Sequence, residues 1–209
     1  MQPTAPAASA EPLAAPRQRL LDGLARALRE HGLQGTKVTD IVANARTSKR
    51  TFYQLFADKE ACLVELADSW AAGLHRAVEA GVDREAPWDS QVDAAVGTFL
   101  TAVARDPELG VVVWRDMPAL GGRAAELRER DLERYAAFYR ELSQGPVMRR
   151  AGVRPLSWET AIILAGGLSE LIDRCVRTGR PLEFAGEAMK EAVKLMFGIG
   201  PGPGPSPGR

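Results

Sequence analysis

The sequence has few of the residues that build metal or redox sites. It contains two cysteines, Cys62 and Cys175, and two histidines, His31 and His75, in a chain of 209 residues. Their spacing matches neither a zinc site nor a redox motif. We therefore expect two buried thiols, no bound metal and no cofactor. His75 is interpreted as a surface or packing residue rather than a ligand.

Motifs of catalysis are also missing. The sequence has no nucleophile elbow, no phosphate-binding glycine loop and no metal-spaced set of His, Cys and Glu. The glycines near the C-terminus alternate with prolines, which suits no phosphate cradle. We therefore expect no catalytic residues and no enzymatic activity.

Long hydrophobic runs are absent. The longest apolar run, residues 161–168, is far shorter than the roughly 20 residues that span a bilayer. The first sixteen residues are rich in proline and alanine and lack the apolar core of a signal peptide. We expect a cytoplasmic protein without a membrane segment.

The net charge of the chain is zero, but the charges are unevenly distributed. Residues 17–60 carry nine Lys and Arg against five Asp and Glu, a net charge of +4, which leaves −4 for the rest. A basic segment on an acidic body is the asymmetry expected when one end of a protein faces phosphate. The charge pattern therefore favours nucleic-acid binding near the N-terminus.

The segment over residues 36–59 has the pattern of two short helices joined by a tight turn. The first helix is predicted over residues 38–44. The second begins at Ser48, whose hydroxyl can cap it, and ends near Phe56. Phe52 and Phe56 are four residues apart, so they share the inward face of this helix.

The outward face of the second helix is polar. It carries Lys49, Arg50, Thr51, Tyr53 and Gln54. Arg and Lys contact guanine edges or phosphates, Gln contacts adenine, and hydroxyl groups contact phosphates, so this face suits the major groove of DNA. The alternative is a polar hairpin whose charges are only solvated. The agreement of spacing, cap and polar face argues against it.

The same segment resembles the DNA-binding helix-turn-helix of the tetracycline-repressor (TetR) family of bacterial transcriptional regulators. The resemblance extends over about residues 17–75 and is carried by Thr36, Ile41, Ala45, Ser48, Thr51-Phe52-Tyr53, Phe56 and Asp58-Lys59-Glu60. Arg46 in the turn and Arg50 on the polar face depart from it, since the family often has glycine at both places. A left-handed backbone at Arg46 would cost about 1 kcal/mol.

The polar face and the resemblance together predict the DNA-binding residues. Lys49 and Arg50, with Gln54, are predicted to read bases. The residues predicted to hold phosphates or set the register are Thr36, Lys37, Ser48, Thr51, Tyr53 and Lys59. The implied partner is a double-stranded DNA operator, and a two-fold symmetric dimer would require a palindromic one.

The rest of the chain is predicted to be helical, because no stretch shows sustained strand alternation. Further helices are predicted over residues 16–31, 58–80, 88–105, 107–117, 123–142, 158–178 and 182–197. The predicted fold class is all-α. Its parts are a disordered arm (1–15), a three-helix DNA-binding domain (16–60), a helical effector-binding and dimerisation domain (61–197) and a disordered Gly/Pro tail (198–209).

The last two predicted helices have broad apolar faces. The first of them is apolar over much of its circumference and has small residues in its middle. Small residues let a neighbouring helix approach closely, so the pair suits a four-helix bundle between two copies of the chain. The resemblance implies the same homodimer, and the alternative is an ordinary monomer core.

The middle helices are rich in aromatic residues. Similar regulators hold a small effector between such helices, and an aromatic, partly polar cavity would accept a small apolar or aromatic compound. The predicted effector-binding residues are Trp114, Met117, Phe138 and Tyr139. The alternative is that these side chains simply fill the core.

Taken together, the sequence predicts a dimeric transcriptional regulator that binds a palindromic operator and is released by a small-molecule effector. The resemblance implies that such a regulator is usually a repressor. A helical ligand-binding or protein-interaction module without specific operator recognition is the alternative, which Arg46 in the turn keeps open.

Overall fold

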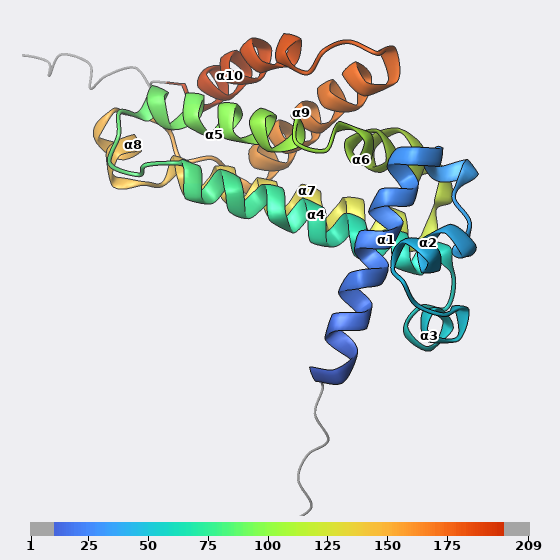
Figure 1. Ribbon diagram of the computed structural model, residues 1–209. Helices are drawn as coiled ribbons and strands as arrows, with labels where there is room; N and C mark the ends of the chain where they lie inside the picture. Colours follow the sequence, from blue (N-terminus) through green and yellow to red (C-terminus); the bar gives the residue numbers. More distant parts are fainter. Residues whose placement is uncertain (1–10, 199–209) are drawn as a thin grey trace, which may run out of the picture. The chain divides into compact units, whose positions relative to one another are not determined.

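The computed structural model describes residues 11–198, and over this range the chain is helical without any strand (Figure 1). The elements are α1 (Glu11–Gly35), α2 (Val38–Asn44), α3 (Lys49–Leu55), α4 (Lys59–Gly81), α5 (Trp88–Val103), α6 (Pro107–Val111), η1 (Val112–Asp116), η2 (Met117–Leu120), α7 (Gly122–Ser143), α8 (Pro146–Arg150), α9 (Trp158–Thr178) and α10 (Glu183–Phe197). The prediction of an all-α fold is confirmed. The predicted disorder of residues 1–10 and 199–209 falls outside the described residues.

The chain divides into two compact units, and the boundary between Asp68 and Ser69 lies inside α4. The first unit contains α1, α2, α3 and the beginning of α4. The second contains the remainder of α4 and all later helices. Within residues 11–198, no helix combines the length and hydropathy that crossing a bilayer requires.

Helix α1 is longer at its N-terminal end than the sequence predicts. It begins at Glu11 rather than at Pro16, because the first turn tolerates the proline at position 12 and the residues after it are good helix formers. At the other end Gly32 has non-helical backbone angles, with φ of 65°, directly after the predicted end at His31. A further helical turn then leads to Gly35, so α1 has a kink at Gly32.

Helices α1 and α2 approach each other closely at Gly23. A Cβ atom at this position would lie 2.6 Å from the carbonyl oxygen of Ile41, so only glycine fits there. The Asn44 side-chain amide donates a hydrogen bond to the Gly23 carbonyl over 3.3 Å. The apolar stripe of α1 is buried and consists of Leu20, Leu21, Leu24, Ala27 and Leu28.

The second unit has its core between α4, α5, α7, α9 and α10, with α7 packed along α9 and α10 packed on α5 and α9. The loop between α4 and α5 is fastened by the buried Gln91. Its amide donates to the carbonyls of Arg84 and Ala86 over 3.0 and 2.8 Å. Both cysteines are buried and free, as predicted, and burial raises the pKa of the Cys62 thiol to about 12.

The region after α5 differs most from the prediction. A single helix was predicted over residues 107–117, but the chain forms the short α6, then the π-helical η1, then the 3₁₀-helical η2. Pro118 lacks an amide hydrogen and cannot continue a regular α-helix. The five-residue α8 was not predicted, since one turn is too short to show a hydrophobic period.

Candidate nucleic-acid interface and effector cavity

Helix α3 is built as the sequence predicts. Ser48 caps it, because its Oγ accepts a hydrogen bond from the Thr51 amide over 3.1 Å. The Ser48 and Thr51 hydroxyls also lie 3.0 Å apart, within hydrogen-bonding distance. Phe52 is fully buried and Phe56 nearly so, and both rings pack inside the unit. The inward face of α3 is therefore fixed, and the other face remains at the surface.

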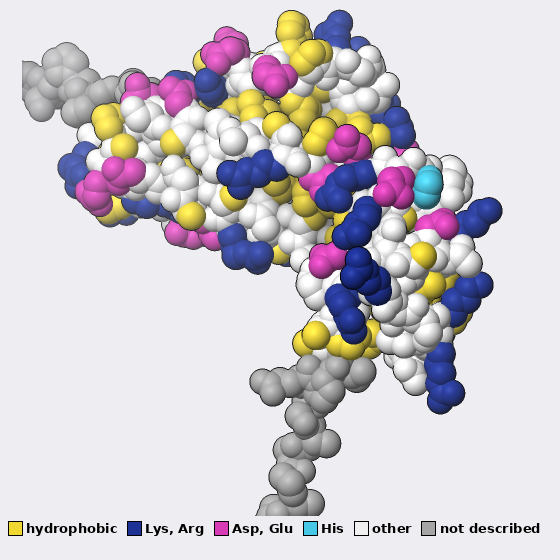
Figure 2. Space-filling model, viewed as in Figure 1, with side chains coloured by type: hydrophobic (Ala, Val, Ile, Leu, Met, Phe, Trp, Pro, Cys, Tyr) yellow, Lys and Arg dark blue, Asp and Glu magenta, His cyan; other side chains and the backbone are white. Residues whose placement is uncertain are grey.

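The exposed face of α3 carries the residues predicted to read bases. Lys49, Arg50 and Gln54 are exposed, and the Tyr53 side chain is 58% exposed. Figure 2 shows Lys and Arg side chains spread over the surface of the α1–α3 unit. The predicted polar face is thus presented to solvent as one surface. Thr51 is half-buried at its edge.

Thr36 is placed differently from the prediction. It is only 2% exposed, and its hydroxyl donates to the Gly32 carbonyl over 2.7 Å. This hydroxyl closes the bent end of α1 and does not face the surface. Its neighbour Lys37 is exposed and is the N-cap residue of α2, and its amide donates to Asp40 Oδ2 over 2.8 Å.

Lys59 also has internal partners. Its Nζ donates to the carbonyls of Leu33 and Thr36 over 3.0 and 2.9 Å. These bonds join the first residue of α4 to the end of α1 and to the connection between α1 and α2. Asp58 caps α4, since its Oδ1 accepts from the Ala61 amide over 2.7 Å. The geometry gives Lys59 a structural role that the sequence did not suggest.

Arg17 is a positioning residue that sequence reasoning missed. Its guanidinium forms an ion pair with Glu65, donates to the Leu55 carbonyl over 3.3 Å and lies 4.9 Å from the centre of the Phe56 ring. One side chain of α1 thus holds the end of α3 and the start of α4. No local motif marks this role, because its partners are about 40 or more residues away in the sequence.

The turn between α2 and α3 contains the described chain's one left-handed residue other than glycine. Arg46 has φ of 50°. The predicted strain at this position is therefore present in the backbone. A long, exposed side chain occupies a place that glycine would fill without steric cost.

The second unit contains a cavity of about 450 Å³. It is lined by residues of α4, α5, η1, η2, α7, α9 and α10, and all four predicted effector residues, Trp114, Met117, Phe138 and Tyr139, are among them. The aromatic residues that complete the lining are Trp70, Phe99 and Tyr135. Packing within the chain has left room among these rings.

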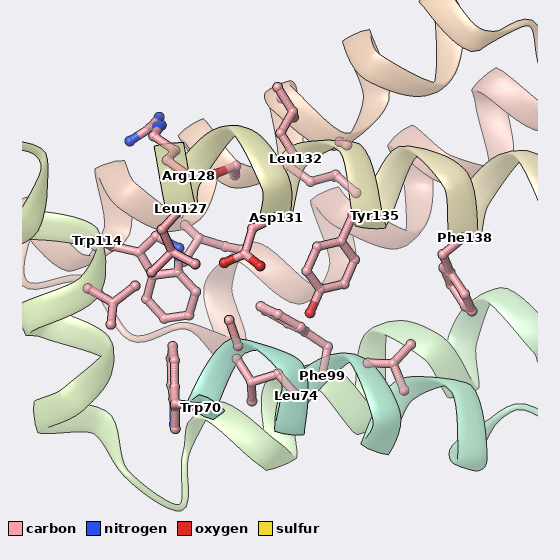
Figure 3. Close-up of a pocket in the computed structure, with 18 of the residues that line it drawn as sticks. Trp70, Leu74, Phe99, Trp114, Leu127, Arg128, Asp131, Leu132, Tyr135 and Phe138 are labelled. Atoms are coloured by element: carbon pink, nitrogen blue, oxygen red, sulfur yellow. The ribbon is translucent and has the colours of Figure 1, made fainter. Parts of the chain in front are cut away.

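Two charged side chains line this cavity, and both come from α7. Arg128 is exposed and is directed away from the other labelled lining residues (Figure 3), whereas Asp131 is half-buried and its carboxylate lies among them. Arg134 donates to Asp131 Oδ1 over 2.7 Å. Sequence reasoning missed Asp131. The available signal was its spacing of four residues from both Leu127 and Tyr135, which puts it on the inward face of α7.

The buried polar groups near the cavity are held neutral. Burial raises the pKa of both Tyr135 and Tyr139, so the two phenols keep their protons. His75 packs edge-on against the rings of Tyr135 and Phe138, at 5.4 and 5.8 Å between centroids. Burial lowers the pKa of His75, while the nearby Glu79 carboxylate acts in the opposite direction.

These two features, a capped helix with an exposed polar face and a helical unit with a cavity, define a helix-turn-helix protein with a helical body. Residues 20–66 match the family model of bacterial regulatory proteins, tetR family. None of the curated proteins compared with the chain matches it.

Solved structures extend the likeness to nearly the whole chain. FadR from Thermus thermophilus, a TetR family transcriptional repressor in complex with lauroyl-CoA, has a TM-score of 0.68 at 19% identity, covering 91% of this chain and 99% of that one. FadR from Bacillus subtilis in complex with stearoyl-CoA has a TM-score of 0.69 at 16% identity, covering 84% and 96%. The fatty acid degradation regulator FadR from Bacillus halodurans has 0.68 at 17%, covering 87% and 97%.

Residues 20–66 thus match the helix-turn-helix part of the TetR family, and the chain as a whole shares the fold of the FadR structures.

Proposed function

We propose that the chain acts as a homodimeric repressor that binds a palindromic operator through α3 and leaves it when an effector fills the cavity of the second unit. The observation that carries this proposal is the exposed polar face of α3, held between the Ser48 cap and a fully buried Phe52. Ser48 caps α3 and Phe52 anchors it in the core of the first unit. The orientation of the polar face is therefore fixed by the packing of that unit.

The roles of the exposed residues follow from their chemistry. Lys49, Arg50 and Gln54 are proposed to contact base edges, because their donors and acceptors match those of the major groove. Lys37, Tyr53 and the Ser48–Thr51 hydroxyl pair are proposed to contact phosphates and set the register. The net positive charge of residues 17–60 would attract the DNA backbone at a distance.

The proposal of a dimer through α9 and α10 is supported by their exposed apolar side chains. Among the described residues, the large apolar side chains that remain exposed are, apart from Tyr53, Trp158, Ile163, Phe184 and Leu195, and all four belong to α9 and α10. Their exposed fractions run from 40% to 72%. Exposed apolar side chains gathered on two helices mark an interaction surface, and a second copy of the same pair would cover them.

The effector is proposed to be a small compound with an apolar body. The cavity is large enough for a drug-sized molecule and its walls are mostly apolar and aromatic. The Thermus thermophilus and Bacillus subtilis FadR structures hold lauroyl-CoA and stearoyl-CoA, so this fold accepts ligands with long apolar chains.

The proposed release mechanism is a difference in affinity between two states. Trp70, Leu74 and Val78 of α4 line the cavity, and the same helix begins at Lys59 in the DNA-binding unit. An effector that prefers one position of α4 would favour a spacing of the two α3 helices that misfits the operator. The shift cannot exceed the difference in effector affinity for the two states.

Selection of DNA from a random pool by the purified protein, followed by sequencing, tests the proposal. A palindrome with a fixed half-site spacing is the expected result, because a two-fold dimer reads two half-sites. Failure to recover any motif at low salt would favour the alternative, a helical ligand-binding or interaction module without operator recognition.

Arg50→Ala distinguishes base reading from phosphate contact. We expect the variant to lose about 1–3 kcal/mol of binding free energy and to relax specificity at one position in each half-site. Competition assays with operators altered at single positions measure this. Equal weakening on all sequences would assign Arg50 to the phosphates instead.

A further inference from the structure

We propose that the effector is an organic cation with an apolar body, recognised by the aromatic walls of the cavity and by the Asp131 carboxylate. This inference rests on the proposed effector role of the cavity and names the ligand class. Neither the family match nor the similar structures assign a positively charged ligand to this chain. Of the two charged side chains in the cavity lining, the Asp131 carboxylate is directed inward and Arg128 is directed away.

Aromatic rings and the Asp131 carboxylate line the same cavity. The rings of Trp70 and Trp114 meet edge-on with 5.2 Å between centroids, and Phe99 lies 6.3 Å from Trp114 and 6.1 Å from Tyr135. The faces of such rings carry negative potential, and several of them around one space attract ammonium groups. Aromatic walls alone would also accept a neutral ligand. A charged group in the wall is therefore needed to favour a cationic ligand over a neutral one.

Asp131 is that group. Figure 3 shows its carboxylate between Trp114 and Tyr135, directed toward the interior, while the Arg128 side chain is directed away. Arg134 donates to Asp131 Oδ1 over 2.7 Å, and this bond holds the carboxylate in place. A cation placed there would interact with a negative charge in a partly enclosed space, where the attraction is stronger than in bulk water.

An anionic ligand is disfavoured by the same geometry. A carboxylate or phosphate placed among these rings would face Asp131 and the negative ring faces, and like charges in a partly buried site repel strongly. The chain therefore differs in ligand charge from the FadR structures that hold acyl-CoA, although it shares their fold.

The test uses four probes that differ mainly in charge. Decyltrimethylammonium, decan-1-ol and decanoate share one chain length and differ in the head group, and lauroyl-CoA adds a bulky anionic head. Binding is followed by intrinsic tryptophan fluorescence, because Trp70 and Trp114 line the cavity. We expect the ammonium compound to bind about tenfold more tightly than the alcohol, and decanoate and lauroyl-CoA to bind more weakly than the alcohol.

Asp131→Asn and a matched control locate the effect. The substitution keeps the shape and removes the charge, so it should lower the affinity for the ammonium compound about tenfold and leave the alcohol within about twofold. Asp116→Asn is the control, because Asp116 is as exposed as Asp131 (21% against 22%), is also paired with an arginine and does not line the cavity. It should change neither affinity.

The outcomes separate the inference from the proposed function. Equal or tighter binding of decanoate or lauroyl-CoA, or an unchanged ammonium affinity in Asp131→Asn, would overturn the cationic class and leave the cavity as an effector site. Failure of all four probes to bind would overturn both. Release of selected operator DNA by the ammonium compound, from wild-type protein but not at the same concentration from Asp131→Asn, would support both together.

Discussion

Lys59 was predicted to contact a phosphate, but its ammonium group makes hydrogen bonds inside the protein. Its ammonium group is bonded to two backbone carbonyls and holds α4 to the connection between α1 and α2. A lysine placed this way stabilises the DNA-binding unit from inside. A phosphate contact would use only the remaining bonding capacity of the same group.

Substitution of Lys59 therefore has a distinct expected signature. Lys59→Met should lower the free energy of unfolding by about 1–3 kcal/mol, because two carbonyls lose a charged donor. The slope of operator affinity against salt should stay as in wild type. Urea denaturation and binding at several salt concentrations measure the two effects.

Lys37→Met, at an exposed position, is the control for stability. A salt slope reduced by about 0.9 in Lys59→Met would instead make Lys59 a phosphate contact.

Arg46 stores strain in the turn of the helix-turn-helix. With φ at 50°, its backbone is in a region that side chains other than glycine enter at a cost. Arg46→Gly should raise the free energy of unfolding by about 0.5–1 kcal/mol, the gain being reduced by the greater freedom of glycine in the unfolded chain. Chemical denaturation checks this. Arg46→Ala removes the charge but keeps the strain, so a gain in Ala as large as in Gly would refute the backbone explanation.

At the level of single residues, the sequence predicted what local spacing determines. The Ser48 cap, the buried Phe52 and Phe56, and the exposed Lys49 and Arg50 all follow from positions within one helix. Contacts between distant segments could not be predicted in this way. Thr36, Lys59 and Arg17 have partners set by how α1 bends and where α4 begins, and no short motif encodes either.

Among the helices, those with a clear hydrophobic period were predicted nearly to the residue. Helices α2 and α9 have the predicted bounds, and α3, α5, α7 and α10 differ by two residues or fewer at each end. The irregular turns η1 and η2 could not be predicted, since their shape depends on packing beside Trp114 and Met117 and not on a repeating pattern. These turns supply part of the cavity wall, so the size and shape of the cavity could not be predicted from the sequence.

The exposed apolar face of α9 and α10 gives a prediction at the level of these helices. Ile163→Glu and Leu195→Glu, at positions 65% and 72% exposed, should convert a dimer into a monomer, because each would bury a charge in the proposed interface. Sedimentation measures the mass, and circular dichroism checks that the helices remain. Ala80→Glu, on the exposed side of α4, is the control. Variants that remain dimeric would move the interface elsewhere.

For the whole molecule, the buried His75 makes stability depend on pH in a defined direction. Because burial lowers its pKa in the folded state, the unfolded chain binds a proton that the folded chain does not, once the pH falls below about 6.5. Protonation therefore favours unfolding, and stability should fall on acidification from pH 7 to pH 5. Glu79 and Glu141 favour the charged form and Arg134 opposes it, so they set the size of the effect.

Comparison of urea midpoints at pH 7 and pH 5 checks this. His75→Phe keeps a ring against Tyr135 and Phe138 and removes the titrating group, so its loss of stability between the two pH values should be smaller than that of wild type. His31→Gln, at an exposed position, should lose as much as wild type. An equal loss in His75→Phe would assign the acid sensitivity to the carboxylates.

The boundary between the two units lies inside α4, with no loop between them. An exchange of DNA-binding units between related regulators must therefore join two halves of one helix in phase. Each inserted or deleted residue turns one unit against the other by about 100°, and an insertion of seven restores the phase to within about 20°. In chimeras made at this boundary, the response to the effector should therefore rise and fall with the number of inserted residues, with the period of the α-helix. The length of the joint then becomes a variable for engineering new sensors.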